Sequence, residues 1–349
     1  MAAIQYTDRG TAVRVTPAGR ALTQAVLAAL GAPSILNTQP WHWRIDGDTA
    51  QLRADRGRQL ATIDPDGRLL TLSCGAALHH ARVALAADGV AAEVAYLPDD
   101  DDPDLLATVR HAGPAARAGT TVTAEPQRLR RAMGIRRTDR RPFADLDVPE
   151  AALDRLRAAA TAAGADLHVV RPQDLVDVAV AAGHAADVER ADPAYRAELA
   201  AWVRAGAEDG VPPGTAAAPG PRPVPIRDFT GTAADQVSVY AGGEVADRHA
   251  RYAVLVTRGD LPRDWIAAGE ALSAVLLTAV GDGLAASPMS DVVEVPAARA
   301  MLRRMLGDVG HPAMAVRIGV LAKLDAPPVT PRRRSVSTVE VVAEPSPDR

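Results

Sequence analysis

Two long apolar segments that resemble each other constrain the fold of this chain more than any other feature. The first is LLTLSCGAALHHARVALAADG at residues 69–89, and the second is DWIAAGEALSAVLLTAVGDGLAAS at residues 264–287. Both are apolar on most faces, which predicts buried helices. At a constant offset of 194 residues, the first matches the second at Gly75 and Gly269, Ala77 and Ala271, Leu78 and Leu272, and Gly89 and Gly283. This repeat predicts two copies of one unit folded into a single core.

The elements around the apolar segments recur in a similar order in both halves. Thr16 and Pro17 predict the start of a helix over TPAGRALTQAVLAALGA, since threonine caps a helix and proline is tolerated in its first turn. Asp147, followed by Glu150 three residues later, predicts a capping box for the helix ALDRLRAAATAAGA. Strands are predicted near residues 50–54, 90–97, 166–170, 252–257 and 313–321. The fold class that follows is α+β.

Charge and cysteine content exclude several classes of partner. The 349 residues carry a formal net charge of -4, whereas a nucleic acid or an anionic membrane requires a basic face. The single cysteine, Cys74, excludes an intrachain disulfide and favours a reducing cytoplasm. No secretion signal is visible and no apolar run reaches eighteen residues unbroken, so a membrane span is not expected.

Motifs of several enzyme classes are absent from the sequence. There is no GxxxxGK[ST] phosphate loop, no GxGxxG after a strand, no HExxH and no GxSxG. His79 and His80 lie in the first apolar segment with no acidic residue at metal-ligand spacing, so no metal site is expected. Residues 210–226, GVPPGTAAAPGPRPVPI, are rich in proline and glycine and predict a long loop of the kind that forms lids or binding loops.

Two polar segments could carry chemistry. PSILNTQPW at residues 33–41 offers backbone N–H groups, a hydroxyl and two carboxamides between prolines, which suits a planar heterocycle or a phosphate. RRAMGIRRTDRR at residues 130–141 holds six arginines and one aspartate. Such a cluster is either a solvated helix face with salt bridges or a set of guanidinium groups for a phosphate or an anionic cofactor.

At these segments the chain resembles the nitroreductase superfamily of FMN-dependent oxidoreductases, whose members typically carry RRSxRxF and then PSxxNxQPW. Here the order is reversed, because PSILNTQPW precedes RRTDRRPF. Family members are typically homodimers with FMN at the subunit interface, so the reversal fits a fused pair that keeps one composite site. This arrangement resembles the Acg family of actinobacterial nitroreductase-like proteins. It implies a nitroreductase-like half over residues 1–125 and another over 126–349, with a lid-like insertion at about 190–230.

The resemblance implies which residues bind FMN, one per chain, with NAD(P)H as the electron donor. The cationic segment would contact the flavin's polar edge or its phosphate, and the PSILNTQPW loop would contact FMN from the other half. The loop after the second apolar segment would lie over the ring, and a C-terminal arginine would bind the phosphate. The implied FMN-binding residues are Pro33, Ser34, Asn37, Gln39, Arg136, Arg137, Thr138, Arg140, Met289, Ser290, Arg332 and Arg333. No catalytic side chain is implied, since the flavin carries the chemistry.

Three functions remain open at this point. The first is an oxidoreductase that passes electrons from NAD(P)H through one FMN to a small-molecule acceptor. The second is a non-catalytic protein that sequesters FMN under the proline-rich segment, with Tyr195, Trp202 and Phe229 nearby. The third is an arginine-rich interaction protein without flavin. A fused pair already contains the family's dimer interface, so a monomer is expected, although a further dimer stays open.

Overall fold

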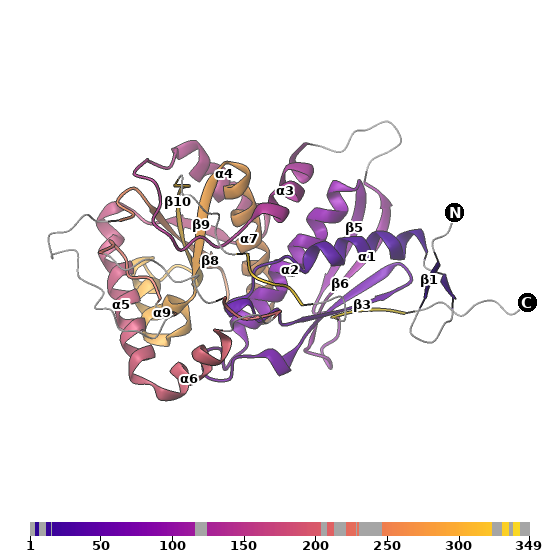
Figure 1. Cartoon of the computed structure of the whole chain (residues 1–349), viewed down its shortest axis with the longest axis horizontal. Coiled ribbons are helices and arrows are strands. Elements are labelled where there is room, and N and C mark those ends of the chain that lie inside the picture. The colour runs from indigo at the N-terminus through magenta and orange to yellow at the C-terminus, as the bar shows by residue number, and fades with distance from the viewer. Residues whose placement is uncertain are drawn as a thin grey trace, which may run out of the picture.

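The protein folds around two sheets and a central pair of helices (Figure 1). The structure is a computed structural model. It describes residues 16–115, 124–203, 208–212, 221–227, 229, 246–322, 330–334 and 338–342, together with the backbone of residues 4–6 and 12–14. The proline-rich segment and the lid-like insertion predicted from the sequence therefore lie partly outside the described residues.

The two sheets repeat one strand order. In the first half, β3 (Trp41–Asp46), β4 (Thr49–Ala54), β5 (Val90–Tyr96) and β6 (Leu105–Pro114) pair in the order β3-β4-β6-β5. In the second half, β7 (Asp166–Val169), β8 (Arg251–Thr257), β9 (Leu284–Met289) and β10 (His311–Val320) pair in the order β7-β8-β10-β9. When the four strands of each half are numbered by their order in the chain, they lie side by side as first, second, fourth and third. Every one of these pairs is antiparallel. The predicted α+β duplication is therefore present in the topology.

The helices of the two halves correspond in the same way. The helices α1 (Pro17–Ala29) and α4 (Glu150–Ala162) directly precede β3 and β7, the strands that come first in the repeated strand order. The helices α2 (Arg68–Ala87) and α7 (Pro262–Gly281) each connect the second strand to the third. Thr16 caps α1 as predicted, because its side chain accepts a hydrogen bond from Gly19 N. The predicted capping role of Asp147 is wrong: α4 begins after Pro149, and the Asp147 carboxylate pairs instead with His249 Nδ1 at 2.7 Å.

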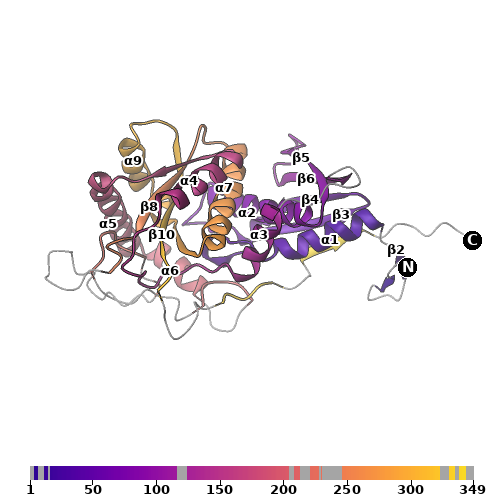
Figure 2. The same cartoon turned by 90° about the horizontal axis from the view of Figure 1, so that it is seen from above.

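The central helices α2 and α7 are buried and pack directly on each other (Figure 2). A Cβ on Gly75 would lie under 3.0 Å from the carbonyl oxygen of Ile266, and one on Gly269 would lie equally close to that of Leu72. Leu72 and Ile266 are themselves one repeat apart. Leu72 belongs to the hydrophobic core of the second half, and Ile266 belongs to that of the first half. Reciprocal contacts of this kind define a two-fold relationship, as at an isologous dimer interface.

Both central helices are long and apolar enough to cross a membrane by length and composition alone. In this fold, however, 83% of the apolar window of α2 and 78% of that of α7 are buried inside the protein. They therefore serve as core helices, and the cytoplasmic location stays a prediction. Trp41 and Trp43 are also fully buried, in the core of the first sheet.

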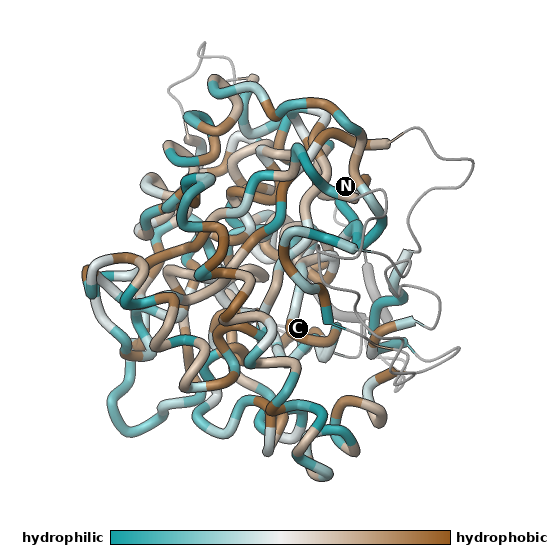
Figure 3. Tube along the Cα trace, turned by 90° about the vertical axis from the view of Figure 1, so that its left-hand side faces the viewer, coloured by the Kyte–Doolittle hydropathy of each residue, from teal (hydrophilic) through white to brown (hydrophobic). Residues whose placement is uncertain are grey.

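Additional segments interrupt the repeat in the second half. The helices α5 (Leu175–Ala191) and α6 (Pro193–Trp202) lie between β7 and β8, while α8 (Asp291–Glu294) and α9 (Pro296–Met305) lie between β9 and β10. On the side of the molecule near α5, α6 and α9, hydrophilic and hydrophobic residues alternate along the chain (Figure 3). Amphipathic helices of this kind cover a core on one face only.

Two further elements lie near the boundary between the halves or cross it. The helix α3 (Ala124–Ile135) contains the predicted boundary at residue 125 and packs on both central helices. The short strand β11 (Val339–Val341) comes from the C-terminal part of the chain but joins the first sheet, in parallel with β3. The C-terminal segment thus crosses back to the first half. The strands β1 (Ile4–Tyr6) and β2 (Ala12–Arg14) form a separate pair.

Candidate functional site

A cavity lies at the junction of the two halves. It contains about 740 Å³ of empty space, including its opening to solvent. The first half contributes Pro33, Ser34, Ile35 and Leu36 from the PSILNTQPW loop and Leu69, Leu72 and Ser73 from α2. The second half contributes Thr138, Arg140, Leu272, Met314 and the stretch from Ser287 to Asp291, and the insertion contributes Ile226, Arg227 and Phe229. Six of the twelve predicted residues, Pro33, Ser34, Thr138, Arg140, Met289 and Ser290, line this one cavity.

The segment RRTDRRPF is held against the second sheet by buried charges. Thr138 forms an isolated parallel bridge with Ala286 of β9. The fully buried Arg317 donates hydrogen bonds to the carbonyl oxygens of Asp139 at 2.7 Å and Arg141 at 3.0 Å. Its partner Asp247 accepts from the backbone N–H of Phe143 at 2.9 Å. These contacts fix the backbone on both sides of Arg140.

Arg140 presents its charge to the cavity. Its guanidinium lies 4.6 Å from the ring centroid of Phe229, in a cation–π arrangement. Burial, together with the neighbouring charges of Arg227 and Arg317, lowers the pKa of Arg140 to about 10, and the carboxylate of Asp291 opposes this shift. A buried cation among like charges favours an anionic ligand or an electron-rich edge of a ligand.

A second group of arginines, here called the arginine cluster, comprises Arg136, Arg137 and Arg333. Arg136 is only 3% exposed, and its Nε and Nη1 atoms have no hydrogen-bond partner in the part of the chain that the structure describes. Burial, followed by the charges of Arg333 and Arg137, lowers the pKa of Arg136 to about 9. Burial and the charge of Arg137 lower the pKa of Arg333 to about 10. Buried N–H donors without a partner, such as those of Arg136, lower the stability of the folded protein unless a ligand accepts hydrogen bonds from them.

The PSILNTQPW loop has a strained backbone. Leu36, Asn37 and Gln39 have φ angles of 43°, 55° and 51°, in the left-handed region that non-glycine residues rarely adopt. Ser34 Oγ accepts a hydrogen bond from Gln39 N at 2.9 Å, and Ser73 Oγ of α2 accepts from Ile35 N at 3.0 Å. Strain of this kind persists where surrounding contacts impose it, which is common at functional sites.

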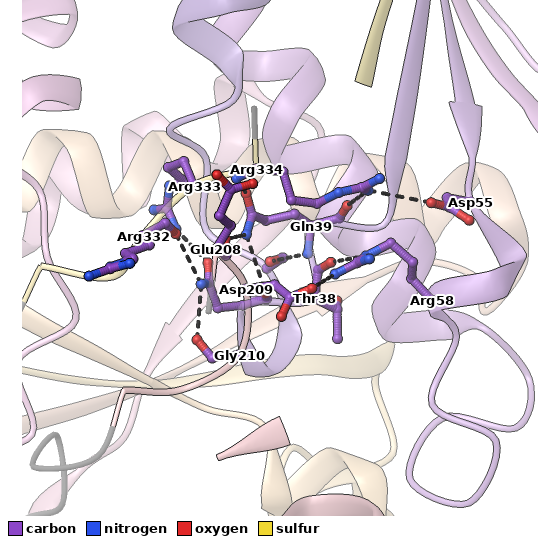
Figure 4. Close-up of polar contacts among 12 residues, drawn as sticks. Thr38, Gln39, Asp55, Arg58, Glu208, Asp209, Gly210, Arg332, Arg333 and Arg334 are labelled. Carbon is purple, nitrogen blue, oxygen red and sulfur yellow. Dashed lines mark hydrogen bonds and ion pairs between the residues drawn. The ribbon is translucent and has the colours of Figure 1, made fainter. Parts of the chain in front are cut away.

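Asn37 and Gln39 supply many of those contacts, and Figure 4 shows the Gln39 side chain beside Glu208 and Arg334. Asn37 Nδ2 donates to the carbonyl oxygens of Gly210 at 3.0 Å and Arg332 at 3.2 Å, while its Oδ1 accepts from Arg333. Gln39 Nε2 donates to the carbonyl oxygen of Glu208 at 2.9 Å. Gln39 Oε1 accepts from Arg334 N at 2.8 Å. The two amides thus join the loop to the insertion and to the C-terminal segment, and their role toward FMN stays a prediction.

The insertion is docked on the first half by charge and by apolar contact. The Glu198 carboxylate of α6 accepts hydrogen bonds from the backbone N–H groups of residues 61, 62 and 63 at 2.7, 3.0 and 2.8 Å. On its other side the insertion pairs with the second half, where Arg227 bridges Glu189 of α5 at 2.6 Å and Glu294 of α8 at 2.5 Å. Tyr195 and Val211 share a hydrophobic cluster with Leu36, Leu60 and Ile63, and Trp202 and Phe229 pack against it. Of these aromatic residues, Phe229 lines the cavity, whereas Tyr195 and Trp202 are not among its lining residues, so their closure over a flavin stays a prediction.

Several residues of the site carry no recognisable signal in the sequence. Ser73 and Asp291 line the cavity but belong to no motif. Burial raises the pKa of Asp291 to about 6, against the lowering effect of Arg227. Arg317 and Asp247, which hold the cationic segment, are far from it in the chain. Only the buried, strand-internal position of Arg317, a charge in the apolar stretch of residues 313–321, could have drawn attention to it.

The repeat also defines a second position that corresponds to the cavity, with the roles of the two halves exchanged. Side chains fill this second position. The repeat offset places Tyr96 at the position of Ser290 and Arg263 at that of Leu69. Arg263 stacks 3.6 Å from the ring centroid of Tyr96, and the Tyr96 hydroxyl donates to Glu270 at 2.9 Å. Glu270 also pairs with Arg82. Tyr96 and Arg263 are bulky side chains that contact each other, and Tyr96 is hydrogen-bonded to Glu270. They replace the smaller cavity-lining residues Ser290 and Leu69.

The fold and the site define a duplicated α+β protein with a cavity between its two halves that Arg140 and Arg227 line. Over 332 residues the chain is 36% identical to the "Putative NAD(P)H nitroreductase Rv3131" of Mycobacterium tuberculosis (strain ATCC 25618 / H37Rv), covering 93% of this chain and 92% of the relative. It is 33% identical to the "Putative NAD(P)H nitroreductase acg" of the same strain over 317 residues, covering 89% of this chain and 93% of the relative. The chain therefore belongs to this Acg-like nitroreductase family, and the resemblance seen in its motifs is confirmed.

Other comparisons are weaker. No protein-family profile matches the chain. An FMN-bound nitroreductase from Bacteroides fragilis NCTC 9343 aligns with 61% of this chain and 98% of its own, at 13% identity and a TM-score of 0.39. The FMN-dependent nitroreductase NfnB from Mycobacterium smegmatis, solved with NADPH, aligns with 60% of this chain and 96% of its own, at 17% identity and a TM-score of 0.38.

Proposed function

We propose that this protein is an FMN-dependent NAD(P)H oxidoreductase that holds a single FMN between its two halves and reduces a small-molecule acceptor. The names of the relatives support an NAD(P)H-linked reductase. The observation that carries the proposal is the buried guanidinium of Arg136, whose Nε and Nη1 lack a partner in the described structure. A phosphate monoester would satisfy both donors with charge-assisted hydrogen bonds.

The residues present fit FMN in two separate ways. The cavity is largely apolar at Ile35, Leu72 and Leu272, which suits a flat aromatic ring system, and it has polar groups at Ser34 and Thr138. The arginine cluster supplies charge for the phosphate, with Arg333 brought in by the C-terminal segment. In this proposal Met289 and Ser290 lie beside the ring, while Asn37 and Gln39 fix the loop that carries Ser34.

The chain's own residues would bind and tune the cofactor. FMN, when bound, supplies the redox chemistry, accepting and donating electrons as a hydride or singly. Arg140 would stabilise negative charge on the reduced ring, because its buried guanidinium is preorganised at the cavity wall. Phe229, Ile226 and Arg227 would restrict solvent and select the shape of the molecules that reach the ring.

Anaerobic titration with NADPH and NADH tests the proposed activity. Purified protein loaded with FMN should lose its flavin absorbance within seconds to minutes after a reduced nicotinamide is added. If dithionite bleaches the flavin and neither nicotinamide does, the chain sequesters FMN under the insertion and the oxidoreductase proposal fails. Protein that stays colourless after incubation with FMN would refute both flavin functions and favour an interaction protein.

The proposal includes the assembly state. The repeat places the family's expected dimer interface inside one chain, where α2 and α7 meet. A monomer would therefore be sufficient to form the whole site. Sedimentation equilibrium of the loaded protein should give the mass of one chain.

A further inference from the structure

Two adjacent histidines of α2 make contacts that assign their protons. His80 Nδ1 lies 3.1 Å from the carbonyl oxygen of Ala76 and 2.8 Å from Ser273 Oγ of α7. A carbonyl only accepts hydrogen bonds, so His80 Nδ1 carries a hydrogen. The Ser273 hydroxyl then donates to His79 Nδ1, which lies 2.8 Å away.

This assignment leaves the other nitrogen of His80 as an acceptor. The His80 side chain is fully buried, and its Nε2 has no hydrogen-bond partner among the described residues. Burial, followed by the charges of Arg136 and His79, lowers the pKa of His80 well below its usual value. The ring is therefore neutral in the free protein at physiological pH.

His80 belongs to the surroundings of the arginine cluster. The charged and titratable groups that act on it are Arg136 at the end of α3, His79 of α2 and Arg333 of the C-terminal segment, and α7 presents the Ser273 hydroxyl. Val83 of α2 and Met133 of α3 belong to one hydrophobic cluster, through which the two helices pack. His80 lies three residues before Val83, and Arg136 lies three residues after Met133. Among the described residues, an unpartnered buried acceptor on α2 thus lies within electrostatic reach of an unpartnered buried cation that follows α3, the helix packed on α2.

The two orphaned groups are complementary to one chemical class of ligand. Arg136 needs acceptor oxygens, and the neutral His80 needs a donor. A phosphate monoester that carries one proton offers both, since its charged oxygens accept from the guanidinium and its hydroxyl donates to the imidazole. A free phosphate monoester has a second pKa near 6, so at pH 7.5 it is mostly the dianion.

We propose that His80 Nε2 shares a proton with the phosphate group of the bound cofactor, so that binding near neutral pH takes up one proton from solvent. The proton lies between the phosphate oxygen and Nε2, and no other bond changes. This inference rests on the proposed function, because it takes the phosphate to be that of FMN. It assigns His80 as a binding residue that no motif marks.

Isothermal titration calorimetry of FMN into cofactor-free protein tests the inference. Titrations at pH 7.5 in two phosphate-free buffers with different ionisation enthalpies give the number of protons exchanged. We expect uptake of about one proton and an FMN Kd that rises about tenfold per pH unit between pH 7 and 8. The His80→Gln variant should still bind FMN with near-zero uptake and a flat pH profile, whereas His79→Gln should retain the uptake.

The outcomes separate the two proposals. FMN binding by the wild-type protein with no proton uptake, or with equal uptake in His80→Gln, would overturn the role of His80 and leave the FMN site intact. Absence of any FMN binding by the folded wild-type protein would refute the proposed function itself. If His80→Gln fails to fold by circular dichroism, the wild-type proton count and pH profile still decide the question.

Discussion

His79 and Ser273 are separated by 194 residues in the chain and lie 2.8 Å apart, from Nδ1 to Oγ, in space. Because 194 is also the repeat offset, the two side chains occupy one position of the repeated unit, once in each copy. A position that touches its own counterpart lies on the two-fold axis relating the copies. The axis passes between α2 and α7, so the halves are packed as the two subunits of a symmetric dimer would be.

The close approach of these helices predicts the effect of filling the repeat glycines. Gly269→Ala and Gly75→Ala should each lower the free energy of unfolding by about 3 kcal/mol, since a methyl group would overlap a backbone carbonyl. Urea denaturation measures the change. Gly183→Ala in α5 is the matched control, because nothing lies within 4 Å of its added Cβ. It should be neutral or stabilising by up to about 1 kcal/mol, and an equal loss in all three variants would contradict the packing.

Removing the orphaned guanidinium should weaken FMN binding. Arg136→Ala deletes a buried donor that has no partner among the described residues and that we assign to the phosphate, so we expect the FMN Kd to rise about tenfold to a hundredfold. Fluorescence quenching of FMN on titration with protein measures the Kd. Arg131→Ala, at an exposed position of α3 just before Arg136, is the control and should change the Kd less than twofold. Unchanged FMN affinity in Arg136→Ala would refute the placement of the phosphate.

The contacts of Asn37 predict a link between the insertion and the C-terminal segment. Asn37→Asp keeps the acceptor for Arg333 but removes the donors to the carbonyl oxygens of Gly210 and Arg332. Hydrogen exchange measured by mass spectrometry should become faster in peptides that contain residues 208–212 and 330–334. A peptide from α1 serves as the internal control, and unchanged exchange in both segments would show that Asn37 does not hold them.

The buried carboxyl of Asp64 predicts a pH dependence of stability. Burial raises its pKa from 3.8 to about 6, against the opposing hydrogen bonds from the backbone N–H groups of Leu69 and Leu70. The folded state therefore binds this proton more tightly than the unfolded state does, and stability falls as the pH rises from about 4 to 6. Relative to Asp64→Asn, the wild type should lose up to about 3 kcal/mol over this range.

Thermal or urea unfolding of both proteins at pH 4, 5, 6 and 7 gives this difference. Asp66→Asn, at an exposed acid two residues away, controls for the substitution itself. A wild type that gains stability relative to Asp64→Asn as the pH rises would contradict the sign of the shift.

Much of the fold could be predicted because its signals are local or repeated. The glycines at 75 and 269 and the apolar helices around them indicated the duplication, and Thr16 indicated the start of α1. The capping box at Asp147 failed because a tertiary contact with His249 competes for the carboxylate. The contact of β11 with the first sheet was not predicted, since a three-residue strand has too little pattern.

The site was predictable where a motif carried it and hidden where distant residues supply it. Thr138 and Arg140 reach the cavity from RRTDRRPF, and Ser34 reaches it from PSILNTQPW. Within that second motif, Asn37 and Gln39 have turned toward other segments of the chain, which the composition of the loop does not reveal. The sequence shows His80 only as a histidine of an apolar helix, and its unpartnered Nε2 and the burial of Asp291 are properties of the folded chain.

The number of flavins per chain tests the central claim most directly. Protein saturated with FMN and freed of excess cofactor is denatured, and the released flavin absorbance is divided by the protein concentration from amino-acid analysis. The composite site between the halves, together with the Tyr96, Glu270 and Arg263 group at the related position, predicts a ratio of one. A ratio of two would contradict the filled second site, and a ratio of zero would contradict the flavin site altogether.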